Sequence, residues 1–305
     1  MVENSMTKIR KSKAPREKIG DRAFLTICYI FITLLGLICL YPFLNVVAKS
    51  FSADEYVYAG KVLGIWPMGF NTKAYAYILN SQRYLITMAN TVKITIVGTI
   101  LNLAFTIFVA YAVSRKDMPG AKVIMFAYIF TMMFSGGMIP TYLAVSQIGL
   151  LDSHWSLILP GLVTAYNVIL MRNYIEGLPG ELEESATIDG ASQMQLMFRI
   201  ILPLTLPSLA TIGLFCCVSY WNTYFNALIY INARNKATLQ IYLREVLIST
   251  QTANMDSGMD ELADIASSEG VQGACVVATA LPIICVYPFL QKYYVKGMTL
   301  GAVKG

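Results

Sequence analysis

Charged residues are scarce in this chain of 305 residues. Asp, Glu, Lys and Arg make up 13% of the sequence, whereas a soluble domain carries about 25%. Hydrophobic residues make up 56%, and six long runs among them contain no charged side chain. A bilayer core about 30 Å thick requires roughly 20 apolar residues per helix. The composition therefore predicts a membrane protein and excludes an ordinary soluble helical one.

The usual signatures of catalysis and metal binding are also missing. The sequence has a single histidine, His154, and contains no HExxH, GxSxG or clustered metal-ligand motif. Gly60-Lys61 lacks the upstream glycine of a phosphate-binding loop. None of the six cysteines has CxxC spacing, and all lie in the apolar runs, where buried thiols are the ordinary interpretation. We expect no catalytic site, no metal site and no cofactor bound by this chain, which argues against an intramembrane enzyme.

Ionisable residues are absent from the centres of the apolar runs. Ion-coupled carriers place ionisable or unwound ion-binding elements at that depth. A secondary carrier is therefore kept only as an alternative.

The six apolar runs define the predicted fold class, an all-α membrane protein with six transmembrane helices. The runs are Ala23–Val47, Ile94–Val113, Val123–Val145, Trp155–Met171, Thr205–Ile231 and Val271–Gln291. The predicted organisation is a basic N-terminal tail over residues 1–22, a six-helix domain over 23–295 and a C-terminal tail over 296–305.

Lys and Arg are denser on one side of the predicted spans, and the basic tail 1–22 dominates this bias. The positive-inside rule then places both termini in the cytoplasm. The first run is too long for a signal peptide and no cleavage site follows it, so we expect it to be retained. The net charge of +5 favours contact with anionic membrane lipid and not with nucleic acid.

A polar segment, residues 176–203, separates two of the apolar runs on the predicted cytoplasmic side. Glu181, Glu183 and Glu184 fall in a first helical turn, where carboxylates suit the helix dipole. Gly190 permits a sharp bend, and an amphipathic helix follows. Pro203 is expected to end this segment and to start the next span. A helix that lies on lipid normally carries basic residues. The acidic balance of this segment favours a protein partner instead.

The same segment resembles the EAA loop of the membrane permease subunits of ATP-binding-cassette importers. The resemblance rests on the glutamate and small residues at 184–186, on Asp189-Gly190-Ala191 and on the distal Ile-x-Leu-Pro ending at Pro203, and the one departure is Ser185 for alanine. The resemblance implies that the loop couples the permease to an ATPase subunit. The implied coupling residues are Glu184, Ser185, Ala186, Asp189, Gly190, Ala191, Phe198 and Pro203.

Further motifs resemble carbohydrate-importer permeases, especially the branch for complex oligosaccharides. They are the segments 135–142 and 149–152, the pair Trp221-Asn222, and the ending 296–305. The resemblance implies a type I importer architecture in a bacterial cytoplasmic membrane. It also implies a heterodimer with a second permease subunit, two ATPase subunits that use ATP, and an extracellular or periplasmic solute-binding protein. A permease for a peptide or an amino acid is the alternative.

The fifth apolar run contains an unusually polar and aromatic stretch. An unpaired amide in hydrocarbon costs several kcal/mol, so we expect Asn222 and Asn226, four residues apart, to share a helix face turned to the protein interior or to water. Rings beside amides suit the apolar faces and hydroxyl rims of sugars. The candidate substrate path consists of Tyr220, Trp221, Asn222, Tyr224 and Asn226. The alternatives are helix packing and an interfacial aromatic belt.

Overall fold

The computed structural model describes residues 19–115, 117–253 and 268–302, and these form helices without a strand. The helices are α1 Ile19–Ser50, α2 Asp54–Tyr58, α3 Lys73–Asn80, α4 Gln82–Ser114, α5 Ala121–Met133, α6 Met138–Gln147, α7 Trp155–Ile158, η1 Leu159–Gly161, α8 Ala165–Glu176, α9 Gly180–Ile188, α10 Gln193–Leu196, η2 Met197–Ile201, α11 Leu202–Trp221, α12 Phe225–Tyr230, η3 Arg234–Lys236, α13 Leu239–Ala253 and α14 Ser268–Ala302. The basic tail over 1–18 and the last residues, 303–305, lie outside the described residues.

The described helices amount to four to six candidate spans. Four of the described helices are long and apolar enough to cross a membrane, and the number is six if each of two bent pairs of helices is one span. The second span is longer than predicted, because α4 begins at Gln82 and not at Ile94. Ser81 caps this helix by accepting a hydrogen bond from the backbone N–H of Tyr84. Capping lets the helix extend beyond its apolar part.

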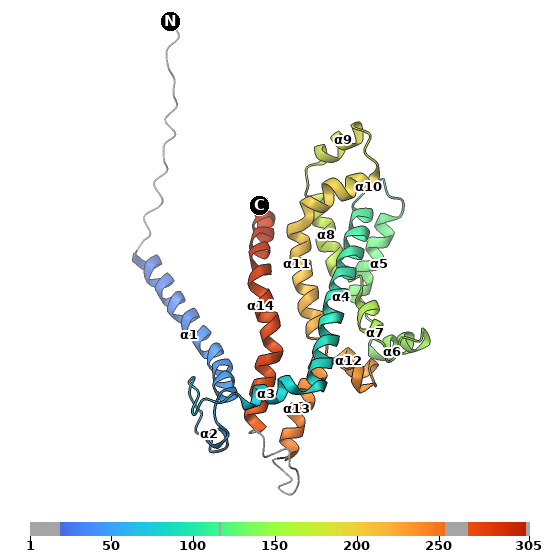
Figure 1. Cartoon of the computed structure of the whole chain (residues 1–305). Helices are drawn as coiled ribbons and strands as arrows, with labels where there is room; N and C mark the ends of the chain where they lie inside the picture. Colours follow the sequence, from blue (N-terminus) through green and yellow to red (C-terminus); the bar gives the residue numbers. More distant parts are fainter. Residues whose placement is uncertain (1–18, 116, 254–267, 303–305) are drawn as a thin grey trace.

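The third and fourth spans are bent where glycine and proline lie. The predicted run Val123–Val145 divides into α5 and α6, which meet at 120°. Gly137, between them, has a φ of 85°, a backbone conformation that favours glycine. The fourth span divides into α7, η1 and α8, with a bend of 50°. In Figure 1, α6 consequently runs across the end of the bundle and does not continue along α5.

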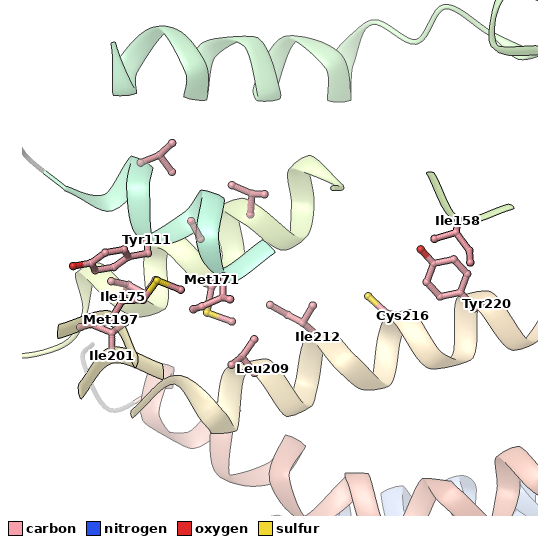
Figure 2. Close-up of a cluster of buried hydrophobic side chains, with 14 of the residues drawn as sticks. Tyr111, Ile158, Met171, Ile175, Met197, Ile201, Leu209, Ile212, Cys216 and Tyr220 are labelled. Atoms are coloured by element: carbon pink, nitrogen blue, oxygen red, sulfur yellow. The ribbon is translucent and has the colours of Figure 1, made fainter. Parts of the chain in front are cut away.

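The core lies where α4, α8 and α11 pack together. Figure 2 shows Leu209, Ile212, Cys216 and Tyr220 along one face of α11, turned toward this core. The spacing of these residues by three and four positions is that of one helix face. Met171 of α8 and Tyr111 of α4 belong to the same cluster. The three helices therefore form a packed unit that supports the loops at both ends.

The first span stands apart from this unit. The most apolar part of α1 has no buried residue. The helix packs mainly against α14, and Asn45 donates hydrogen bonds to the carbonyls of Val62 and Gly64. Figure 1 shows α1 leaning away from the other spans. At the end of the bundle opposite the loop 176–203, α3 and α13 pack against α14 and α4. A smaller buried cluster, which includes Tyr84, Trp221 and Leu239, holds these elements together.

Candidate functional site: a bent polar loop and a polar cluster at the other end of the bundle

The loop 176–203 contains the predicted bend. Helix α9 begins after Pro179 and carries Glu181 and Glu183 in its first turn. Gly190 follows the helix with a φ of 76°. Its N–H donates to the carbonyl of Thr187 at 3.1 Å, and the N–H of Ala191 donates to the carbonyl of Ala186 at 3.0 Å. This pair of bonds is a Schellman motif, which closes a helix through a left-handed residue. The predicted bend at Gly190 is confirmed.

The second limb of the loop is a capped helix that continues into the fifth span. The Ser192 hydroxyl accepts a hydrogen bond from the N–H of Gln195, and the Gln195 side chain accepts one from the N–H of Ser192. This capping box fixes the start of α10. Pro203 lies in the first turn of α11, as predicted for the start of the next span, but the preceding segment does not end there, because one helix runs from Gln193 to Trp221. The π-helical turn η2 ends at Ile201, two residues before Pro203, and such a turn lets a helix bend without ending.

The coupling residues implied by the family resemblance differ in their exposure to solvent. Ala186 is buried, and Ala191 is half-buried. The exposed residues are Glu184, Ser185, Asp189, Gly190, Phe198 and Pro203. The sequence reasoning missed Ile188, whose side chain is 86% exposed. An apolar residue beside Asp189-Gly190 was the available signal, because an isoleucine in an otherwise acidic, solvated turn has no packing role there.

One side chain of α4 and one just after its last residue hold this loop, and neither was assigned to it from the sequence. Arg115, just after α4, forms an ion pair with Glu183 of α9. The hydroxyl of Tyr111 donates a hydrogen bond of 2.9 Å to the side chain of Gln193, at the start of α10. A cavity of 880 Å³ lies between these contacts and the end of α8, and its lining includes Arg115, Glu183 and Glu184. The loop is therefore attached to α4 on both of its limbs.

The candidate substrate path is interrupted by the end of a helix. Helix α11 ends at Trp221 and α12 begins at Phe225, so the prediction that Asn222 and Asn226 share one helix face is wrong. The Asn222 side-chain amide donates to the carbonyl of Val218 at 2.8 Å. A side chain that satisfies the last carbonyls of a helix competes with its continuation. Both asparagines are nevertheless exposed.

The aromatic residues of this stretch have different surroundings. Trp221 is buried, and its indole N–H donates to the carbonyl of Thr279 in α14 at 3.2 Å. Tyr220 is also buried and packs in the core. The ring of Tyr224 lies under the guanidinium of Arg244 in α13, at 5.0 Å from the ring centroid, and their polar atoms are hydrogen-bonded. Of the three aromatic residues in the candidate substrate path, Tyr220 and Trp221 are therefore buried and Tyr224 is partly exposed.

The structure adds two residues of α13 to this stretch. The Gln240 side chain donates to the side chain of Asn222 at 3.3 Å, and Arg244 contacts Tyr224. We call Asn222, Tyr224, Gln240 and Arg244 the outer polar cluster, after the side on which the sequence predicts them. Its members come from segments about twenty residues apart that only the fold brings together. Nothing in the local spacing of Gln240 and Arg244 indicated this role.

A buried polar network crosses the core between the loop and the outer polar cluster. The Asn102 amide donates to the carbonyl of Gly161 at 3.1 Å, at the bend of the fourth span. The Asn102 side-chain oxygen accepts from Asn167 at 3.2 Å and from the thiol of Cys216 at 3.2 Å. Such bonds join helices in a membrane and satisfy backbone groups that a bend leaves unpaired. Within the described residues no group of His, Cys, Asp and Glu could hold a metal ion.

A sequence model for the family described as "Binding-protein-dependent transport system inner membrane component" matches residues 14–300. The chain is 40% identical over 287 residues to the "Polygalacturonan/rhamnogalacturonan transport system permease protein YtcP" of Bacillus subtilis (strain 168), covering 93% of this chain and 99% of that protein. It is 42% identical over 287 residues to "Protein LplC" of the same strain, covering 94% of this chain and 96% of LplC.

The fold is also similar to solved structures. A chain in the crystal structure of a bacterial ABC transporter involved in the import of the acidic polysaccharide alginate matches with a TM-score of 0.84 and 34% identity, covering 92% of this chain and 100% of that one. A second match, at a TM-score of 0.56 and 14% identity, comes from a bacterial alginate ABC transporter in complex with an alginate pentasaccharide-bound periplasmic protein. The second match supports the fold alone.

Proposed function

Because this chain belongs to the family of binding-protein-dependent transport system inner membrane components, we propose that it forms half of an oligosaccharide pathway and is driven by ATPase subunits that dock on the loop 176–203. The chain is a permease subunit of the ATP-binding-cassette importer type. The observation that carries the coupling role is the Schellman bend at Gly190. The bend turns the exposed side chains of Glu184, Ile188 and Asp189 outward at the end of the bundle.

The docking proposal rests on the chemistry of this exposed turn. Ile188 offers an apolar side chain that is 86% exposed, and exposed Glu184 and Asp189 flank it with negative charge. An apolar anchor inside a charged rim is the usual anatomy of a protein interface. Two ATPase subunits, one for each permease, hydrolyse the ATP, and this chain binds no cofactor of its own.

The remaining partners follow from the importer type. A second permease subunit completes the pathway, and a solute-binding protein delivers the sugar on the outer side. The exposed apolar side chains of α1 face lipid or the second permease. The loop 176–203 and both chain termini lie in the cytoplasm, and the protein is embedded in the bacterial cytoplasmic membrane through its six spans.

An oligosaccharide is the proposed solute because of the names of two relatives. One is named for the transport of polygalacturonan and rhamnogalacturonan, and the other belongs to a transporter involved in the import of alginate. The outer polar cluster supports the same class. Tyr224 supplies a ring, Asn222 and Gln240 supply amides, and Arg244 supplies a cation. Rings and amides suit the faces and hydroxyls of sugars, and the guanidinium suits carboxylates.

The test is uptake by the complete importer in proteoliposomes, with oligogalacturonides, alginate oligomers and a peptide as alternative solutes. We expect uptake of an oligosaccharide that requires both ATP and the binding protein. Asn222→Ala and Tyr224→Phe should change the preference among oligosaccharides while ATPase association persists. Uptake of the peptide but of neither oligosaccharide would show that the solute is a peptide. Uptake driven by an ion gradient without ATP would show that the protein is a secondary carrier and would overturn the proposed function.

A matched variant separates the path from packing. Trp221→Phe removes the hydrogen bond to Thr279 and leaves the outer polar cluster in place. We expect Trp221→Phe to lower stability in detergent without changing solute preference. A change of preference with Trp221→Phe, and none with Asn222→Ala or Tyr224→Phe, would place the path elsewhere.

A further inference from the structure

We infer that Arg115 and Tyr111 are positioning residues that attach both limbs of the loop 176–203 to α4, so that a displacement of the loop moves α4 as one rod. The inference rests on the proposed function, because it assumes that an ATPase subunit moves this loop. It names the route by which the movement reaches the outer side.

The first attachment is the ion pair between Arg115 and Glu183. Both side chains are partly buried, at 22% and 31% exposure, so solvent screens the pair less than a fully exposed one. The Arg115 guanidinium also lies 5.7 Å from the ring centroid of Tyr111, a cation–π distance. The guanidinium is thereby held between its own helix and α9, the first limb of the loop.

The second attachment is the hydrogen bond from Tyr111 to Gln193 at the start of α10. Tyr111 is buried, four residues before Arg115 and thus on the same side of the helix. The two attachments lie on opposite sides of the Gly190 bend. A loop tied on one limb alone could pivot at the bend, whereas a loop tied on both limbs carries α4 with it.

The other end of α4 is bonded to the outer segment that leads into α13. The Asn90 amide donates to the carbonyls of Asn235 at 2.9 Å and Ala237 at 3.0 Å. The Thr91 hydroxyl accepts the N–H of Leu239, the first residue of α13, at 2.8 Å. Helix α13 carries Gln240 and Arg244 of the outer polar cluster. One helix thus contacts the loop 176–203 at one end and the support of the outer polar cluster at the other.

Helix α4 is suited to carry displacement between these ends. It is a single helix of 33 residues without proline, and from Asn90 to Arg115 it spans about 37 Å at 1.5 Å per residue. Figure 1 shows it running through the bundle from the end near α9 and α10 to the end near α12 and α13. Coupling between distant sites requires contiguous, rigid elements of this kind.

The experiment uses the complete importer in proteoliposomes and measures sugar imported per ATP hydrolysed. The variants are Arg115→Glu, Glu183→Arg and the exchange that combines them. We expect each single variant to lower the ratio about tenfold, within the range of allosteric coupling, and the exchange to restore most of it. Single variants with the wild-type ratio, or an exchange no better than the single variants, would overturn the inference.

A conformational readout tests the route along α4. Asn235→Cys, in a background without native cysteines, is labelled from outside with an impermeant thiol reagent, with and without ATP. We expect ATP to change the labelling rate in the wild-type loop and to have no effect in Arg115→Glu. An ATP-dependent change that persists in Arg115→Glu would show that the movement takes another route.

Two further variants keep the test decisive. Lys122→Glu reverses an exposed charge in the first turn of α5, the next helix along the chain, and should leave the transport ratio unchanged. If the charge reversals fail to assemble, Tyr111→Phe removes only the hydroxyl that bonds Gln193, and an unchanged ratio in this variant refutes the inference. A wild-type importer without ATP-driven uptake would instead refute the proposed function.

Discussion

The ring of Tyr220 in α11 lies directly against Gly98 in α4. A Cβ atom added at Gly98 would be 2.8 Å from the nearest ring atoms, closer than any real Cβ contact. Tyr220 is 8% exposed, so the ring cannot swing out to relieve the clash. Close approach of two membrane helices at a glycine is a common packing device. Here it places Tyr220 within the contact between α4 and α11.

Gly98→Ala should therefore destabilise the protein. Overpacking of a core typically costs about 1–3 kcal/mol, and a lower midpoint of thermal unfolding in detergent would report it. Gly36→Ala is the matched control, because nothing lies within 4 Å of a Cβ at Gly36 in α1. Combining Gly98→Ala with Tyr220→Leu should recover part of the loss. Equal effects of the two alanine variants would contradict the close approach.

The conformation of Gly190 gives a second prediction. No atom lies within 4 Å of a Cβ built at this residue, so the effect of a side chain there comes from the backbone alone. A left-handed conformation costs an ordinary residue roughly 1–2 kcal/mol, more for a β-branched one, and little for asparagine. Gly190→Val should abolish ATP-driven uptake, and Gly190→Asn should retain most of it. Wild-type uptake by Gly190→Val would show that the bend is not required.

The loop between α6 and α7, on the predicted outer side, leads to a prediction about pH. The Asp152 carboxylate accepts the N–H of Ala233 at 2.9 Å and that of Asn232 at 3.1 Å, and Lys236 lies 3.2 Å from it. These hydrogen bonds, the one from Ala233 first, lower the pKa of Asp152 below its ordinary value of 3.8. The stabilisation is complete above that ordinary value and is lost as the pH falls through the lower pKa of the folded state.

We therefore expect external acidification below about pH 4 to loosen the segment 232–236, measured by limited proteolysis from the outer side. Asp152 has a φ of 55°, which asparagine tolerates, so Asp152→Asn removes the charge while keeping the turn. This variant should be more susceptible at neutral pH and should lack the acid transition. An acid transition of the same size in Asp152→Asn would assign it to another group.

The orientation of the chain is directly testable. Arg115 and Glu184 should face the cytoplasm and Asp152 the outside, because lysine and arginine concentrate on the inner side of membrane proteins. Single cysteines at these positions, in a background without native cysteines, are to be labelled with an impermeant thiol reagent in intact cells. Only the cysteine at 152 should react. Labelling at 184 from outside would reverse the topology.

The corresponding prediction for Asp256 and Lys296 is the outside for Asp256 and the cytoplasm for Lys296. Asp256 lies outside the described residues, and the side chain of Lys296 is not described. Labelling of single cysteines at these two positions with the same impermeant reagent tests both predictions.

Local chemistry was sufficient for much of this protein. An uncharged run long enough to cross a bilayer has few alternatives to a transmembrane helix, so all six spans were predictable. Gly190 was predictable as a bend because its conformational freedom belongs to the residue itself. The likeness of 184–203 to a coupling loop was also visible, since the motif is contiguous in the chain.

Contacts between distant segments decided the rest. Neither Arg115 nor Glu183 indicates its partner, because 68 residues separate them. The 120° bend between α5 and α6 was hidden because glycine and proline are ordinary within membrane helices. Asn222 and Asn226 seemed to share a face only on the assumption of an unbroken helix. The sequence by itself determined the spans and the left-handed bend, since both follow from neighbouring residues. Only the tertiary structure decided which side chains hold the loop and form the outer polar cluster, since long-range packing places them together.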